Sequence, residues 1–336
     1  MKVSELGEFG LIELIASIID KSKNLEYSSW RKLLIGIGDD VAVWKGDSFL
    51  QLVTTDSLIE HVHFDLGIVT WEELGWKSIA VNISDIAAMG GIPCYALVSL
   101  ALPGEIEVDC ISQMYRGMTS ICDRYKIAIA GGNVSSSDRT MITITVLGSL
   151  KGRRMLTRSA AEAGDLIAVT GYTGLSAAGL RMLRQGLNFD ADATRILREA
   201  HLKPVARVTE GLVLLQHGVR TAVDISDGLI ADLTHICMAS HAGALIEQNL
   251  VPVHPVLQTY FKQDYQRLVL AGGEDYELLF TAPGKIVEKL KKALSCPVTV
   301  IGRITGDRPG EVMVLDSNGE YRTSKESGWE HFKSGI

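Results

Sequence analysis

The sequence predicts an α/β fold built as two domains. The chain has 336 residues, which is long enough for two hydrophobic cores. Its composition is 46% hydrophobic and 22% charged, as in globular domains. Strand-like and helix-like stretches occur in both halves without a short repeat, which favours two α/β units over a solenoid. We therefore expect an N-terminal domain over 1–150 and a C-terminal domain over 151–336, divided at the basic run 151–154.

The elements of the first half are predicted from apolar periodicity. Residues 5–20 place apolar side chains at helical spacing, and residues 141–150 alternate as in a strand. Residues 71–89 form a predicted helix whose second half is apolar nearly all round, so this part is expected to be buried. The same criteria predict strands at 49–54, 95–102 and 127–130 and a helix at 107–125.

The second half restarts the same kind of pattern. Strands are predicted at 166–170 and 298–304, helices at 175–184, 204–216 and 285–294, and loops at 186–193 and 252–255. Residues 221–228 form a strand that runs into the start of a helix. Residues 271–280 form a glycine turn that carries three acids into a strand. Acidic residues therefore recur at turns in this half as well.

Composition and charge limit the classes of function. Five cysteines are scattered without a C-x-x-C pair, so they are expected to be reduced. A net charge of -7 argues against a nucleic-acid partner bound through a basic face. Long apolar runs and the features of a signal peptide are missing, so we expect a cytoplasmic protein with no membrane partner. An anionic substrate would then need metal ions as mediators.

Three carboxylates, Asp39, Asp40 and Asp56, lie within a short stretch of the first domain. At an effective dielectric constant near 20, two unit charges about 4 Å apart repel by roughly 4 kcal/mol. Converging carboxylates therefore need solvent or a cation between them, and oxygen ligands favour a hard cation such as Mg²⁺. The alternative is a solvated turn in which Asp39 and Asp40 cap the local backbone.

Asp85 is the only charged residue between Ser78 and Ile92, in the apolar part of the predicted helix 71–89. A buried carboxylate without a partner is costly, so Asp85 requires one. One option is a hydrogen bond to the backbone or to Asn82. The other is a metal ion shared with Asp40 and Asp56.

Two further stretches contain residues that are typical of turns and of phosphate or metal sites. Paired glycines after the predicted strand 127–130, followed by Asn133, would let backbone amides approach a phosphate, although a plain tight turn has the same pattern. Asp224 and Asp227 form a second acidic centre, in which Ser226 or Asp227 is a candidate helix N-cap. A cap would not explain Asp224 as well.

Several common nucleotide motifs are missing. The chain has no G-x-x-x-x-G-K-[ST] and no G-x-G-x-x-G opening a helix, which excludes a P-loop and disfavours a dinucleotide site. The remaining inventory is dispersed carboxylates, Gly-Gly turns and Arg158. These residues suit a site in which Mg²⁺ bridges acidic side chains to phosphate oxygens and an arginine contacts the phosphoryl group that is transferred. The residues alone therefore indicate magnesium-dependent phosphate handling.

The motifs taken together resemble the thiamine-monophosphate kinase family, part of the superfamily of aminoimidazole ribonucleotide synthetase. They occur in the family's order across nearly the whole chain: Gly36-Ile37-Gly38-Asp39-Asp40, Thr54-Thr55-Asp56, His63-Phe64, Asn82-Ile83-Ser84-Asp85, Leu156-Thr157-Arg158-Ser159, Asp224-Ile225-Ser226-Asp227-Gly228, Gly272-Gly273-Glu274-Asp275-Tyr276 and Gly328-Trp329-Glu330-His331-Phe332. The resemblance implies a mixed-sheet N-terminal domain and an α/β C-terminal domain. It also implies transfer of the γ-phosphoryl group of ATP to thiamine monophosphate and a homodimer built through the N-terminal domains.

The resemblance also implies roles for individual residues. Several Mg²⁺ ions would be held by Asp40, Thr54, Thr55, Asp56, Asp85, Asn133, Asp224 and Asp227. ATP would contact Tyr115, Gly132, Asn133, Arg158 and Ser226. Thiamine monophosphate would contact His63, Glu274 and Trp329. The family usually has Asp at the position of Asn133, so one ion would have a neutral ligand here.

No catalytic general base is expected, because the acceptor phosphate is already anionic near neutral pH. Two other functions stay open. One is another ATP-using enzyme of the superfamily, although no cysteine precedes Cys94, as a selenophosphate synthetase would require. The other is a non-catalytic protein that binds divalent cations for regulation.

Overall fold

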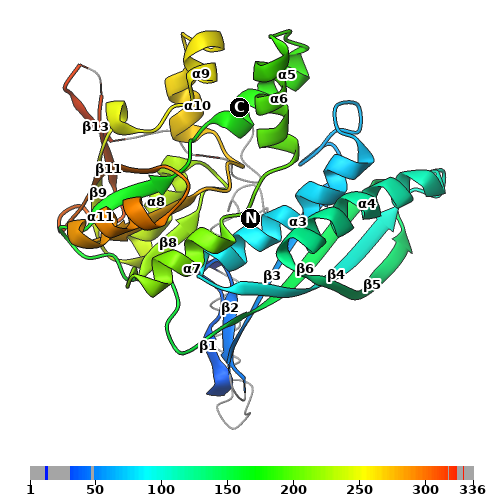
Figure 1. The fold of residues 1–336 in the computed structure, drawn as a ribbon, viewed down its shortest axis with the longest axis horizontal. Coiled ribbons are helices and arrows are strands. Elements are labelled where there is room, and N and C mark those ends of the chain that lie inside the picture. The colour runs from blue at the N-terminus through cyan, green and yellow to red at the C-terminus, as the bar shows by residue number, and fades with distance from the viewer. Residues whose placement is uncertain (1–11, 14–30, 47–48, 317, 324–327, 329–336) are drawn as a thin grey trace.

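The strands form two mixed sheets, one from each half of the chain (Figure 1). The structure is a computed structural model that describes residues 12–13, 31–46, 49–316, 318–323 and 328. The predicted helix over 5–20 lies almost entirely outside these residues. The expected α/β class is confirmed, with sheets of six and seven strands.

The first sheet has the strand order β1-β2-β3-β6-β4-β5. Its strands are β1 (Leu33–Ile35), β2 (Ala42–Lys45), β3 (Leu50–Ile59), β4 (Ile92–Leu102), β5 (Ala128–Ser136) and β6 (Met141–Leu150). Only β4 and β5 pair in parallel, and the other pairs are antiparallel. Among the described strands β5 pairs with β4 alone, so it forms an open edge of this sheet.

Two long helices, α3 (Trp71–Ala88) and α4 (Val108–Tyr125), cover one face of the first sheet (Figure 1). Alternate β6 residues such as Ile142 and Ile144 are buried in the same core as both helices. The two helices pack unusually closely, because a Cβ on Gly117 would lie 1.9 Å from the Glu72 carbonyl oxygen. The second half of α3 is buried as predicted.

The second sheet has the strand order β13-β12-β9-β11-β7-β10-β8. Its strands are β7 (Leu166–Thr170), β8 (Thr221–Asp224), β9 (Gly243–Glu247), β10 (Leu278–Ala282), β11 (Val298–Thr305), β12 (Val312–Leu315) and β13 (Tyr321–Thr323). The helices of this half are α5 (Leu175–Gln185), α6 (Ala191–Leu202), α7 (Val208–Gln216), α8 (Leu229–Ala239), α9 (Pro255–Tyr260), α10 (Tyr265–Ala271) and α11 (Gly284–Ala293), with a 3-10 turn η1 (Gln248–Leu250).

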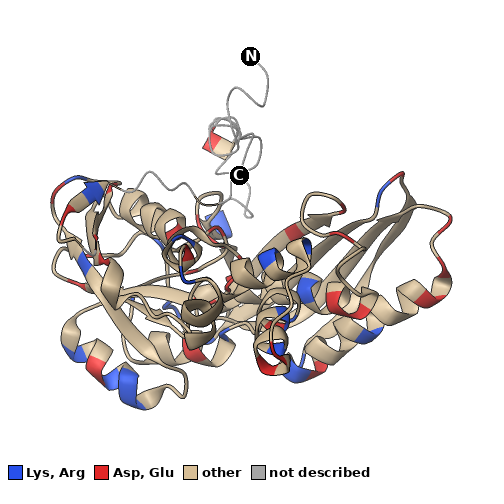
Figure 2. Ribbon diagram, turned by 90° about the horizontal axis from the view of Figure 1, so that it is seen from above, with Lys and Arg blue, Asp and Glu red and all other residues tan. Residues whose placement is uncertain are grey.

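Helix α3 joins the two halves. The Trp76 Nε1 donates to the Pro204 carbonyl oxygen at 2.8 Å, and the Leu156 N–H donates to the Met89 carbonyl oxygen at 3.2 Å. Leu212 and Leu215 of α7 pack against the core of the first sheet. Figure 2 shows the halves side by side, with basic and acidic residues interspersed over both. None of the described helices is long and apolar enough to cross a membrane.

Several predicted boundaries were wrong. β3 continues to Ile59, because it pairs with β6 along its whole length, so Asp56 lies inside the strand rather than after it. β5 continues to Ser136, so Gly132 and Asn133 are strand residues rather than a turn. Gly132 is required there by the close approach of β4, since a Cβ would lie 1.7 Å from the Val98 carbonyl oxygen.

Two further errors concern α6 and α7. The predicted loop 186–193 contains the start of α6, whose N-cap Asp190 accepts from the Ala193 N–H at 2.9 Å. α7 begins at Val208 rather than at residue 204. The domain division at 151–154 stays a prediction.

Gly117→Ala is expected to lower the free energy of unfolding by at least about 1 kcal/mol, despite the better helix propensity of alanine. The added methyl group would overlap the backbone oxygen of Glu72, and this overlap is relieved only if α3 and α4 move apart. Urea denaturation measures the change. Gly104→Ala is the control, because a Cβ at Gly104 meets no atom within 4 Å. Equal stability of both variants would contradict the proposed close packing.

Candidate metal and phosphate site

Three buried or half-buried carboxylates meet where the two halves join. One oxygen each from Asp40, Asp85 and Asp224 lies within 4.8 Å of the others. Asp40 comes from the turn before β2, Asp85 from α3 and Asp224 from the end of β8. We call these three residues the carboxylate cluster. The predicted convergence of Asp40 and Asp85 is therefore present in the fold.

Hydroxyl groups on two sides hold the cluster in place. The Thr54 hydroxyl donates to Asp85 Oδ2 at 2.6 Å, and the Ser84 hydroxyl donates to Asp224 Oδ2 at 2.6 Å. The alternative partner considered for Asp85, Asn82, instead donates its side-chain amide to the Ser78 carbonyl oxygen. Ser84 was not predicted, because its partner Asp224 lies 140 residues away in the sequence.

Arg158 is the cation that contacts the cluster. Its guanidinium donates to Asp40 Oδ1, and its backbone N–H donates to Asp39 Oδ2 at 3.3 Å. Asp39 also accepts from the Asp40 N–H at 3.0 Å, so part of the predicted local capping is present. Asp40 Oδ2 is buried and has no hydrogen-bond partner among the described residues. One arginine therefore leaves the cluster incompletely satisfied.

The cluster has strongly perturbed acidity. Burial, followed by the charge of Asp40, raises the pKa of Asp224 to about 7. Burial and the charges of Asp56 and Asp224 raise the pKa of Asp85 well above its usual range. Burial also raises the pKa of Asp40, although Arg158 opposes the shift. Carboxylates in this arrangement bind a cation or hold protons.

Asp56 and Thr55 point in different directions from β3. Asp56 is close enough to Asp85 for a side-chain hydrogen bond that lowers the pKa of Asp56, although burial raises that pKa overall. The Thr55 hydroxyl donates to the Ile144 carbonyl oxygen at 3.0 Å and contacts the Thr145 hydroxyl on the opposite face of the sheet. The structure thus brings Asp56 to the cluster and does not bring the Thr55 side chain there.

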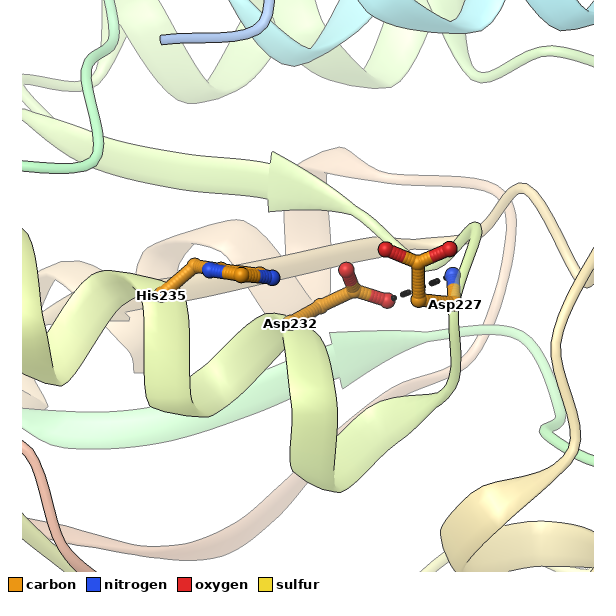
Figure 3. Close-up of side chains that lie close together, drawn as sticks. All are labelled: Asp227, Asp232 and His235. Atoms are coloured by element: carbon orange, nitrogen blue, oxygen red, sulfur yellow. Dashed lines mark hydrogen bonds between the residues drawn. The ribbon is translucent and has the colours of Figure 1, made fainter. Parts of the chain in front are cut away.

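Asp227 lies in a second group with Asp232 and His235 (Figure 3). The three residues each place one ligand atom within 4.8 Å of the others. Asp232 Oδ2 accepts from the backbone N–H groups of Ser226, Asp227 and Gly228, each at 3.1 Å. The alternative of an N-cap at Ser226 or Asp227 is excluded, because the cap of α8 is Gly228 and makes no side-chain bond.

The two groups of acids are electrostatically connected. Burial and the charges of Asp227 and Asp224 raise the pKa of Asp232 well above its usual range, while Arg158 opposes this. Asp232 was missed in the sequence, although an acid in the first turn of a helix after an acidic turn was an available signal. Its three hydrogen bonds fix the turn that carries Ser226 and Asp227.

Glu274 and the cluster both lie near Tyr276. Burial, followed by the charges of Glu274, Asp56 and Asp224, raises the pKa of the Tyr276 phenol far above its usual range, so the ring is near both. The segment of Glu274 packs on the acidic turn, where a Cβ on Gly273 would lie 2.5 Å from the Ser226 carbonyl oxygen. His63 is close enough to lower the pKa of Glu274.

Three residues expected at the ATP site lie apart from the cluster. Tyr115 packs against the core of the first sheet, and burial alone raises its pKa. Gly132 and Asn133 lie on the edge strand β5, three strands from β3, which corresponds to about 14 Å. Trp329 lies outside the described residues.

The donor set fits Mg²⁺. All the converging ligands are oxygens, as a hard cation requires. Opposite ligands of an octahedral Mg²⁺ are about 4.2 Å apart, and the cluster oxygens lie within 4.8 Å of one another. The unpartnered Asp40 Oδ2 offers a ligand that no described protein group uses.

Comparison with known proteins identifies the class first. Residues 38–150 match the family of the AIR synthase related protein, N-terminal domain, and residues 162–315 match the corresponding C-terminal domain. The chain is 35% identical to the thiamine-monophosphate kinase of Aquifex aeolicus, over 99% of this chain and 100% of that protein. It is 35% identical to the enzyme of the same name from Bacillus subtilis, over 98% and 100%.

A solved structure matches over nearly the whole chain. AaThiL complexed with AMPPCP and TMP has a TM-score of 0.84 and 34% identity, covering 98% of this chain and 99% of that chain. The two-domain AIR synthase-related fold is therefore shown. Within that class, the chain belongs to the thiamine-monophosphate kinase family.

Asp224→Asn is expected to stabilise the protein in the presence of a chelator, and more so at pH 8 than at pH 5. The unfolded pKa is about 3.9, whereas the folded pKa is about 7. A raised acid pKa means that the ionised group costs stability, increasingly from about pH 4 until the cost is complete above about pH 7. Asparagine has no such cost, so the gain should be larger at pH 8 by about 2–3 kcal/mol.

Chemical denaturation at both pH values measures this difference. Asp138→Asn is the control, because Asp138 is exposed. A gain for Asp224→Asn that does not change between pH 5 and pH 8 would contradict the charge repulsion in the cluster.

Proposed function

We propose that this chain transfers the γ-phosphoryl group of ATP to the phosphate of thiamine monophosphate, forming thiamine diphosphate. The main structural support is the convergence of Asp40, Asp85 and Asp224 at the junction of the two halves, with Arg158 beside them. The names of the relatives and the AMPPCP and TMP of the AaThiL complex support this choice of donor and acceptor.

The proposed metal ligands are the cluster residues, with Asp56 and Asp227 beside them. Bound Mg²⁺ would neutralise phosphate charge and orient the triphosphate. The hydroxyls of Thr54 and Ser84 hold Asp85 and Asp224, so the chain fixes the ligands before any ion binds. The Thr55 side chain points away from the cluster, and Asn133 lies on the edge strand β5 of the same chain. We therefore expect these two residues to contribute less to metal binding.

The nucleotide is proposed to contact Arg158 and Ser226, and the acceptor to contact His63, Glu274 and Trp329. Arg158 reaches the cluster from the segment that follows the first sheet, and its Nε is buried without a hydrogen-bond partner among the described residues. This leaves a donor for an incoming phosphate. Gly132, Asn133 and Tyr115 stay predicted ATP contacts.

The reaction needs no general base in this proposal. The acceptor oxygen of a phosphate monoester is anionic near neutral pH, so attack requires no prior proton removal. The chain must hold donor and acceptor in line and exclude competing water. The rigid anchoring of the acidic turn by Asp232 serves the first of these tasks.

The test of function is ATP consumption that requires both thiamine monophosphate and Mg²⁺, with phosphorus NMR to detect the diphosphate product. Consumption with Mg²⁺ but without thiamine monophosphate would favour another enzyme of the superfamily. Binding of Mg²⁺ without any turnover would favour the cation-binding regulatory protein.

Asp56→Ala and Asp227→Ala are each expected to reduce turnover below about a tenth of the wild-type rate, since each removes a proposed metal ligand. Circular dichroism checks that both variants stay folded. Asp138→Ala, on the exposed surface, should keep the wild-type rate. More than about a tenth of the wild-type rate in both variants would remove the metal account.

We also propose that the chain forms a homodimer through its N-terminal domain. The face of the first sheet away from α3 and α4 exposes Tyr95 (54%) and Leu97 (40%), and Asn133 lies on the same face. Exposed apolar side chains beside an open strand edge indicate an interaction surface. A dimer would cover them and place Asn133 at the subunit interface.

Leu97→Asp is expected to convert the dimer into a monomer of 36.5 kDa, because it places a charge in the proposed interface. Light scattering after size exclusion measures the mass. Val108→Asp is the control, since Val108 is 80% exposed at the start of α4 and away from this face. A dimeric Leu97→Asp protein would contradict this interface.

A further inference from the structure

The Glu274 carboxylate is held from two helices that belong to different halves of the chain. Its Oε1 lies 2.8 Å from Lys77 Nζ of α3. Its Oε2 lies 3.4 Å from His201 Nδ1 of α6. Each carboxylate oxygen therefore has its own nitrogen partner, and the orientation of the carboxylate plane is fixed from both sides.

The backbone of Glu274 is also constrained. Its φ of 65° is in the left-handed region, which is costly for a residue with a Cβ. The Glu274 N–H donates to the Ser226 carbonyl oxygen at 2.8 Å. Strain of this kind persists only where neighbouring contacts enforce it. The main chain therefore presents this carboxylate at a fixed place beside the acidic turn.

Stability alone does not account for Lys77. Its side chain is 3% exposed, and Nζ makes no hydrogen bond of good geometry with a described residue, so the ion pair with Glu274 is its compensation. A buried ion pair seldom stabilises a protein more than apolar side chains of similar volume. A function in holding Glu274 explains the ammonium better than packing does.

His201 is a neutral donor at physiological pH. Burial, and then the charge of Lys77, lowers its pKa to about 3. An ionised carboxylate only accepts, so the tautomer with a proton on Nδ1 is the one that can direct an N–H toward Glu274 Oε2, which lies 3.4 Å away. In this tautomer the Ser176 oxygen, 3.0 Å from the same nitrogen, accepts from the same N–H, and this bond holds the ring in place.

The charged surroundings keep Glu274 ionised. Burial would raise its pKa, but its neighbours, first of all the charge of Lys77, lower it overall. The side chain is still 29% exposed, so a ligand can reach it. Asp275 and Tyr276 follow it in the chain, and Asp275 accepts from the backbone N–H groups of Gly174 and Ser176.

We propose that Lys77 and His201 are positioning residues, which hold Glu274 as an oriented, ionised acceptor for a donor or cationic group of thiamine monophosphate. This inference rests on the proposed function. Neither residue touches the substrate in this arrangement, because both act through the carboxylate. The binding of thiamine monophosphate therefore depends on Lys77 and His201, whereas the binding of ATP does not.

Lys77→Met tests the proposal by steady-state kinetics. The KM for thiamine monophosphate is expected to rise about tenfold, the effect of misplacing one charged hydrogen bond. The kcat and the KM for ATP should change less than about twofold. An unchanged KM for thiamine monophosphate, or an equal rise in the KM for ATP, would overturn the proposal.

Arg198→Met is the matched control. Arg198 Nε and Nη2 donate to Glu73 at 2.9 and 2.7 Å, so this ion pair joins the same two helices, α6 and α3, about one turn away. Its loss should leave the KM for thiamine monophosphate unchanged. A rise as large as that for Lys77→Met would show a general effect of loosening the two helices and would overturn the proposal.

A double-mutant cycle with Glu274→Gln separates indirect from direct action. If Lys77 acts through Glu274, adding Lys77→Met to Glu274→Gln should not raise the KM for thiamine monophosphate further. This double variant leaves no lone buried charge, so it stays informative if Lys77→Met alone does not fold. A further rise of more than about threefold would show direct contact of Lys77 with substrate and would overturn the proposal.

His201→Leu and His201→Asn complete the test. Leucine removes the donor and is expected to raise the KM for thiamine monophosphate about threefold, whereas asparagine keeps an N–H near the place of Nδ1 and should restore it. Equal KM values for the two variants would overturn the role of His201. Failure of the proposed function is distinct, because the wild-type protein would then show no turnover with thiamine monophosphate.

Discussion

Repulsion among carboxylates at the junction of the two halves is the constraint on which the rest of the structure depends. Asp40, Asp85 and Asp224 come from a turn, a buried helix and a buried strand, so none can withdraw without disturbing a core. At an effective dielectric constant near 20, each pair about 4 Å apart costs roughly 4 kcal/mol when ionised. Arg158 offsets part of this cost, and protons or a cation must offset the rest. The fold therefore places the three carboxylates close together, and bound protons or a bound cation must offset their remaining repulsion.

The sequence predicted the parts of the site that follow from local pattern. Asp85 was expected to need a partner because the part of the helix around it is apolar nearly all round, and the structure supplies Thr54 as that partner. Thr54 and Thr55 could not be separated, because β3 was predicted to end before Asp56. Once β3 is known to reach Ile59, the alternation of a strand places these two threonines on opposite faces.

The parts that could not be predicted depend on pairing across long sequence separations. The glycine pair before Asn133 has the pattern of a turn, and only the neighbouring strand β4 shows that Gly132 serves close strand contact. Ser84 and Lys77 are ordinary polar residues on a helix until α3 packs against the second half and meets Asp224 and Glu274. Tertiary context decided each case, because local propensity carries no information about a partner that lies tens to hundreds of residues away.

The acidic turn and the segment of Glu274 behave as one structural unit. The N–H of Glu274 donates to the Ser226 carbonyl oxygen, and the N–H of Tyr276 donates to the Ile225 carbonyl oxygen at 2.9 Å. Helix α3 contacts both parts of this unit. Its residues Lys77 and Ser84 lie seven positions apart, hence on one face of the helix, with a rise of about 10 Å between them. Ser84 holds Asp224, and Lys77 holds Glu274. A single helix therefore sets the spacing between the carboxylate cluster and Glu274, which the proposed direct transfer between two bound substrates would require.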